Sequence, residues 1–411
     1  MSEATETIET TETIETTETT EIEKKPPTGS ILGLLIVIAI GFVFYFVLSA
    51  IGGNGSLNYD SVVNGITKSI PQQLQWLLMN FTEPQFYAGI FAGIFVIVGG
   101  FVAWILARAN SKLSGIDVCY GSANLFPWVF ASQLISVSLA IFVFRYINLF
   151  DSLGVVWVAT FVSIVGAPPA VMFLYGPSIK TLLTGSILGG LMCPPVATWL
   201  SIYVVGPLDV PGVVSNVLTM AITGVLICYI CKTLPWIKKI ELKDHRRTSK
   251  PGENVYSAKW FVRRCFADFS EAQFYGNEIA GIFVLIGVII DWVISSSLPA
   301  YGSGVLPALI LSQFVGTAVG VFLYADKFDN GGWYATYVPV VSVGPACVLF
   351  FGGGIHVAVV AGALGAIIGP PFAAYFASRL PEGVHATNAN VLSMGISSII
   401  VCMVMRFTGW F

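Results

Sequence analysis

Two short stretches of the sequence combine residue types that bind polar solutes. The first octet, NFTEPQFY, covers residues 80–87, and the second octet, DFSEAQFY, covers residues 268–275. Each octet places a carboxylate and an amide beside two aromatic side chains, with the polar groups at Glu83, Gln85, Glu271 and Gln273. We expect these groups to bind a solute or to gate the two mouths of a path. The alternative is structural, because acids favour helix N-termini and aromatic rings favour the membrane interface.

Further amides lie inside apolar runs at matching places after the two octets. Gln133 matches Gln313, and Asn216 matches Asn390. Polar side chains in such runs usually face the protein interior or a pathway. All four are therefore candidates to line a path, although interhelical hydrogen bonding would also explain them.

Two acids follow the second octet without a counterpart after the first. Glu278 and Asp291 are thirteen positions apart, which on a helix is about 20 Å along the axis. They are too distant to act as a pair. Either one is a candidate to bind H+ or Na+ as a coupling ion, and placement near the membrane interface is the alternative.

Double prolines form a third matching feature. Pro194-Pro195 and Pro370-Pro371 each follow a series of glycines. Proline removes a backbone donor and breaks a helix, and paired interrupted segments mark the substrate site in many carriers. We expect proline-broken helices that shape a binding site here, with simple structural kinks as the alternative.

The composition places these groups in a membrane. Of 411 residues, 55% are hydrophobic and only 10% are charged, and the mean hydropathy is +0.80. A soluble domain has about 25% charged residues. Continuous apolar runs near the roughly 20 residues needed to cross a bilayer as a helix recur along the chain. The sequence therefore predicts an all-α integral membrane protein.

The runs predict about eleven transmembrane helices, and the chain divides into five regions. The expected spans are 29–51, 86–107, 126–147, 153–175, 179–205, 212–231, 274–296, 303–325, 334–352, 355–378 and 389–409. The regions are a disordered, acidic Glu/Thr-rich tail (1–27), a first helix with a polar connection (28–79), a first repeat (80–231), a basic loop (232–267) and a second repeat (268–411).

The two repeats are recognisable by their sequence. Residues 81–104 align without a gap with residues 269–292, with 12 identities in 24 positions, and residues 157–199 align without a gap with residues 333–375. With five spans each, the two repeats would cross the membrane in opposite directions. Inverted repeats of this kind are characteristic of secondary transporters. A miscount by one span would make the repeats parallel instead.

The charges predict the orientation. Ten Lys and Arg residues lie between Lys232 and Arg264, and the positive-inside rule places such a loop in the cytoplasm. The N-terminus is then cytoplasmic and the C-terminus lies outside the cell membrane.

These patterns favour a permease that moves a small polar or anionic solute by alternating access, as an H+ or Na+ symport. The expected partners are the solute, the coupling ion and the lipid bilayer, with no nucleic acid; a homo-oligomer is left open. No GxxxxGK phosphate loop, HExxH zinc motif or GxSxG elbow is present, so we expect neither an enzyme nor a resident cofactor or metal. A channel, a group-transfer permease and a non-transporting scaffold are the alternatives.

Overall fold

The structure is a computed structural model that describes residues 28–116, 125–155, 157–240 and 252–409. The tail expected to be disordered, residues 1–27, lies outside the described residues. Within them the elements are helical, and the only strand-like pairing is an isolated bridge between Asn54 and Ser295.

Eight helices within the described residues are long and apolar enough to cross a membrane. The chain is therefore an α-helical membrane protein. The eight are α1 (Ile31–Ala50), α4 (Ile90–Arg108), α5 with η2 (Leu125–Val143), α9 with η4 and α10 (Ile179–Leu208), α11 (Val213–Thr233), α14 (Leu306–Leu323), α16 (Ile355–Ala377) and α17 (Thr387–Thr408).

Three of the eleven expected spans correspond to shorter elements. One is α13, which has 17 residues, and the other two are each divided by a residue with non-helical backbone angles, Gly166 or Ser342. The elements are α13 (Glu278–Ile294), α7 (Val162–Val165) with α8 (Ala167–Tyr175), and η7 (Val338–Val341) with α15 (Val343–Phe351). The number of crossings stays a prediction.

The remaining elements are short and connect the long helices. They are α2 (Tyr59–Val63), α3 (Ile70–Asn80), η1 (Glu83–Gln85), η3 (Tyr146–Asn148), α6 (Leu149–Leu153), α12 (Ala258–Asp268), η5 (Ala300–Gly302) and η6 (Ala325–Gly331).

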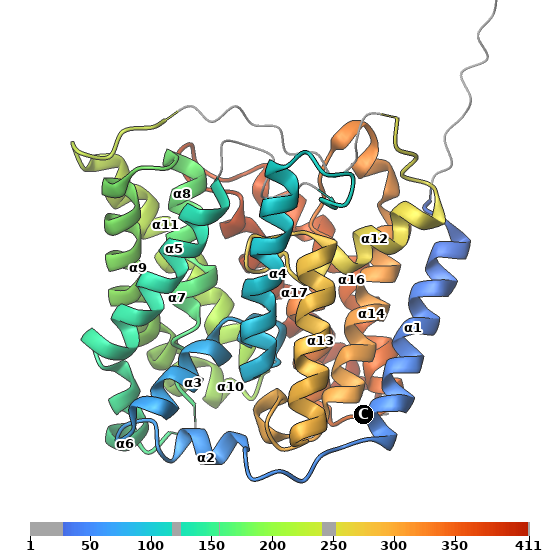
Figure 1. The fold of residues 1–411 in the computed structure, drawn as a ribbon, viewed down its shortest axis with the longest axis horizontal. Coiled ribbons are helices and arrows are strands. Elements are labelled where there is room, and N and C mark those ends of the chain that lie inside the picture. Colours follow the sequence, from blue (N-terminus) through green and yellow to red (C-terminus); the bar gives the residue numbers. More distant parts are fainter. Residues whose placement is uncertain (1–27, 117–124, 156, 241–251, 410–411) are drawn as a thin grey trace, which may run out of the picture.

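Helices α4 and α13, which follow the two octets, pack side by side and antiparallel at the centre of the molecule (Figure 1). Asp291 near the end of α13 accepts hydrogen bonds from the backbone N–H groups of Phe91 (3.0 Å) and Ala92 (2.9 Å) at the start of α4. Small residues allow the close approach, because a Cβ on Gly287 would lie 2.6 Å from the Cα of Ala92. Asp291 thus caps the N-terminus of α4.

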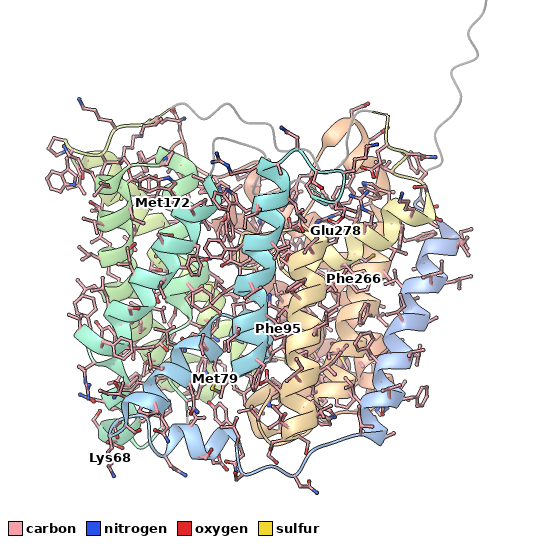
Figure 2. All side chains as sticks on the ribbon, in the orientation of Figure 1. Lys68, Met79, Phe95, Met172, Phe266 and Glu278 are labelled. Carbon is pink, nitrogen blue, oxygen red and sulfur yellow. The ribbon has the colours of Figure 1, made fainter. Side chains whose placement is uncertain are left out.

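Helices α3 and α12 lead into the two octets in the same way. Each has 11 residues and ends at the first residue of its octet. Each crosses the following long helix at a glycine, since a Cβ on Gly93 would lie 2.1 Å from the Leu78 oxygen and a Cβ on Gly281 would lie 1.9 Å from the Phe266 oxygen. The similarity therefore begins upstream of the octets. Figure 2 shows Met79 of α3 in the lower half of the molecule and Phe266 of α12 in the upper half.

The start of α1 and the described ends of the basic segment lie at one edge of the helix bundle, and the C-terminal end lies at the opposite edge (Figure 1). Residues 241–251 of that segment lie outside the described part of the chain. In Figure 2, Lys68 lies at the edge opposite the basic segment.

The helices do not break at the double prolines, which corrects the expectation of proline-broken helices. Helix α9 runs through Pro194 and Pro195, and α16 runs through Pro370 and Pro371. The breaks lie instead at Gly166 and Ser342, in the preceding segments.

Tyrosine side chains explain why the proline-containing helices continue. A proline leaves the carbonyl four residues earlier without its helical donor. The Tyr146 hydroxyl donates to the freed Leu191 oxygen (2.7 Å), and the Tyr324 hydroxyl donates to the freed Ile367 oxygen (2.8 Å). The same repair at both places satisfies one of the two carbonyls that each double proline frees, and a bilayer requires such internal partners.

Candidate functional site

The two octets meet in the interior of the protein. The Gln85 side-chain amide donates to the Gln273 side-chain oxygen and accepts from the Gln273 amide, both at 2.6 Å. Each amide also donates to a backbone oxygen at the start of the other octet, Phe269 or Phe81, both at 2.7 Å. Both glutamines are fully buried. The sequence led us to expect the octets at two separate mouths of a path. In the structure they lie together in the interior instead.

Helix length explains the meeting of the octets. Eleven residues of α3 or α12 rise about 16 Å, which is about half of the roughly 30 Å hydrocarbon core. After each of these helices the backbone turns through the same conformation, since Phe86 and Phe274 both have φ of 65°. A left-handed conformation is uncommon for a bulky residue, so its occurrence at both places marks the octets as structural equivalents.

The second pair of glutamines joins this network. The Tyr87 hydroxyl donates to the Gln313 side-chain oxygen (2.7 Å), and the Tyr275 hydroxyl donates to the Gln133 side-chain oxygen (3.1 Å). The Gln133 amide also donates to the backbone oxygen of Gln273 (2.9 Å), and the Gln313 amide donates to the backbone oxygen of Gln85 (3.1 Å). Each bond joins one half to the octet of the other half. Four buried glutamines thus hold the interface between the two halves.

The octet glutamates have matching tryptophan donors. The indole N–H of Trp157 donates to Glu83, and the indole N–H of Trp333 donates to Glu271. The sequence alignment pairs the two tryptophans. That pairing was the signal by which they could have been identified as site residues.

The surroundings of the two glutamates differ in charge. The Arg264 guanidinium contacts both Glu271 and Asp268, the latter at 2.7 Å, and Arg264 and Asp268 are fully buried. The positions equivalent to this arginine and aspartate in the first half are Trp76 and Asn80, which are also buried but uncharged. A buried charge needs a partner, and only the second octet has a cationic partner beside its glutamate.

A cavity of about 190 Å³ lies between the two halves. Its walls contain equivalent residues from both: Glu83 with Glu271, Phe86 with Phe274, Phe161 with Tyr337, Val165 with Val341, Asn216 with Asn390 and Met220 with Met394. Phe173, Tyr301, Trp333, His385 and Thr387 complete the polar and aromatic part of the lining. Apolar walls with a few converging polar groups are typical of a small-molecule site.

The two asparagines contribute differently to this cavity. The Asn390 amide donates to the Tyr337 hydroxyl (3.2 Å). The side-chain oxygen of Asn216 is buried and has no hydrogen-bond partner among the described residues. An unsatisfied buried acceptor is unfavourable, so Asn216 is available to a bound molecule.

The other predicted site residues lie outside the cavity lining. The four prolines lie within α9 and α16, and the four glutamines form the network beside the cavity.

The two coupling-ion candidates have structural partners. Asp291 caps α4, and Glu278 accepts from the Ile116 N–H (2.5 Å) and the Arg263 guanidinium (2.8 Å). Figure 2 shows Glu278 near the edge that carries the basic segment.

Sequence reasoning missed several residues of the cavity lining, namely Phe161, Phe173, Tyr301, Tyr337 and His385. Besides the tryptophans, it also missed four residues of the network and the ion cluster. Arg264 was counted only as part of the basic loop, and Asp268 only as the start of an octet. Tyr87 and Tyr275 were treated as interfacial aromatics. Their matching positions in the octets were visible, but their hydrogen bonds to glutamines on other helices were not.

The sequence was compared with protein-family models and with curated proteins. No protein-family model matches the chain, and no curated protein matches it in sequence.

Proposed function

We propose that this protein is a secondary transporter, a permease that moves a small polar solute across the membrane by alternating access. The observation that carries the proposal is the cavity, because equivalent residues of two similar segments face each other across it. In carriers built from inverted repeats, the substrate site lies at the repeat interface near the membrane midplane.

The proposed architecture is a pair of inverted repeats with α1 in addition. The first repeat contains α4, α5, the divided α7–α8 segment, α9 and α11. The second contains α13, α14, the divided η7–α15 segment, α16 and α17. The antiparallel packing of α4 on α13 supports inversion, and counting the divided segments gives five crossings in each repeat and eleven in the chain.

The proposed orientation follows from the basic segment. It shares an edge of the bundle with the start of α1, opposite the C-terminal end. The positive-inside rule then places the N-terminus in the cytoplasm and the C-terminus outside.

Solute binding is tested by the thermal stability of the purified protein with a panel of sugars, amino acids, carboxylates and amines. A ligand that binds only the folded state raises stability by about 2.7 kcal/mol at a hundredfold excess over its dissociation constant. We expect at least one class to stabilise the wild-type protein and to stabilise Glu83→Gln less. The matched control is Glu382→Gln, which changes an exposed carboxylate outside the cavity lining.

The outcome also separates the competing classes. Stabilisation that is the same in wild type and Glu83→Gln would move the site away from the cavity. No stabilisation by any solute would contradict a carrier and favour a scaffold. A channel would show solute flux without exchange of bound solute across the membrane.

A further inference from the structure

The carboxylate of Glu83 has one oxygen without a partner. One oxygen accepts from the Trp157 indole, whereas the other is buried and has no hydrogen-bond partner among the described residues. The side chain is 1% exposed in total. At Glu271 the Trp333 indole and the Arg264 guanidinium contact both oxygens. The two glutamates thus differ in that Glu83 lacks the cation that contacts Glu271.

The groups that face Glu83 do not supply this cation. Tyr59 of α2 and Tyr301 of η5 are close enough to interact with its charge, and both are neutral when protonated. Across the cavity lies Glu271, whose charge is shared with Arg264. No Lys or Arg is among the described residues that line the cavity, and His385 is the only histidine among them.

An uncompensated carboxylate in such a place has two stable forms. Burial of an unpaired charge is costly, so the group either takes up a proton or pairs with a cation. The walls favour an organic cation, because Phe86, Phe161, Phe173 and Phe274 line the same cavity. Aromatic faces attract ammonium groups, most strongly where water is excluded.

We propose that Glu83 binds a proton and a small organic ammonium ion in turn, so that the protein exchanges one for the other. This inference rests on the proposed carrier function and replaces the expected polar or anionic solute and the expected symport with a cation and an antiport. As the ammonium ion enters, the carboxyl O–H bond breaks and its proton leaves to the solvent on that side. On the other side a proton returns to the same oxygen as the ammonium ion departs. One positive charge moves in each direction.

The probe is tetramethylammonium, which has no proton of its own to exchange. We titrate it into the full-length purified protein in weakly buffered detergent at constant ionic strength, with NaCl as the reference salt. Proton release is measured together with thermal stability. We expect about one proton released for each tetramethylammonium bound. Affinity should rise about tenfold for each pH unit while the free protein carries the proton, because a raised pH removes the competing ion.

The variants separate the proton site from general damage. Glu83→Gln keeps an oxygen for the Trp157 indole but carries no ionisable proton. We expect it to release no proton and to bind tetramethylammonium about 30-fold or more weakly, as for a lost partner of a buried charge pair. The Glu382→Gln control should retain both binding and release.

Several results would overturn the inference. Tetramethylammonium binding without proton release, or equal binding by Glu83→Gln, would remove Glu83 from the exchange. Stabilisation by carboxylates or sugars but not by ammonium ions would refute the cation and leave the carrier intact. No stabilisation by any class would refute both.

Discussion

The side-chain amides of Gln85 and Gln273 donate to each other across the interface of the two halves. Each residue is the equivalent of the other in the alignment. A reciprocal contact of this kind supports the proposed inversion of the two segments, since a pseudo-two-fold axis between the two glutamines would relate them. Both glutamines are fully buried, so the contact places the octets in the interior.

The reciprocal contact predicts equal effects of two substitutions. Gln85→Leu and Gln273→Leu should each lower the free energy of unfolding by about 1–3 kcal/mol, because each removes the donor to the side-chain oxygen of the facing glutamine and the donor to one backbone oxygen of the other octet. The double variant should lose less than the sum of the two, since the residues share one interaction. Unfolding in mixed detergent micelles measures all three values. Strict additivity would contradict the contact.

The buried ion cluster predicts a large effect in one half only. Arg264→Met should lower stability by about 3–5 kcal/mol, because Asp268 and Glu271 lose their cation. Adding Asp268→Asn should restore part of the loss by removing a buried charge. Trp76→Met, the equivalent change in the first half, strands no charge, and adding Asn80→Asp to it should lower stability further, because that change buries a carboxylate without a cation. The same unfolding measurement checks this asymmetry. A mild effect of Arg264→Met would show that the cluster is not buried as described.

The tyrosine repair of the proline helices predicts a dependence on the proline. Tyr146→Phe should cost about 1 kcal/mol in the wild-type background, because the Leu191 carbonyl loses its donor. In a Pro195→Ala background the new backbone N–H bonds that carbonyl, so the same change should cost much less. A double-mutant cycle of unfolding free energies measures the difference. Equal costs in both backgrounds would rule out the repair.

The glycine crossings predict that two matched positions reject alanine. Gly93→Ala and Gly281→Ala should each destabilise the protein by about 1–3 kcal/mol, because the added methyl group meets a backbone oxygen that cannot move without the helix. Gly212→Ala is the control, since a Cβ there meets nothing within 4 Å. Thermal stability of the three variants in detergent checks the pattern. Tolerance at both crossings would contradict the packing of α3 and α12.

Much of the helical framework was predictable from the sequence. The run that includes Ile31–Ala50 is continuously apolar and long enough to cross a bilayer. Helix α1 lies within the span that this run predicts. The double proline at Pro168-Pro169 was a signal for the division at Gly166, whereas the segment around Ser342 reads as one apolar run. The other two double prolines suggested breaks where the helices continue, because the tyrosine donors to α9 and α16 come from other segments.

The candidate site was predictable as residue types but not as an arrangement. Glu83, Glu271, Asn216 and Asn390 were identified by repetition, and all four line the cavity. The octets meet because α3 and α12 are each about half as long as a membrane-spanning helix. These two helices were not predicted as membrane segments, because their sequences contain too few apolar residues to be recognised as such. Repetition also could not show that Arg264 balances one glutamate and leaves the other unbalanced, because that difference is an exception to the repeat.

The most direct test of a carrier is the reactivity of a cysteine introduced at Asn216, which lines the cavity. The native cysteines within the described residues are buried, and the unsubstituted protein gives the background. We predict that a membrane-impermeant thiol reagent labels Asn216→Cys from either side of sealed vesicles, while glutathione trapped inside the vesicles is not consumed. Labelling from one side only, or from neither, would contradict alternating access to this cavity, and consumption of the trapped glutathione would indicate an open channel.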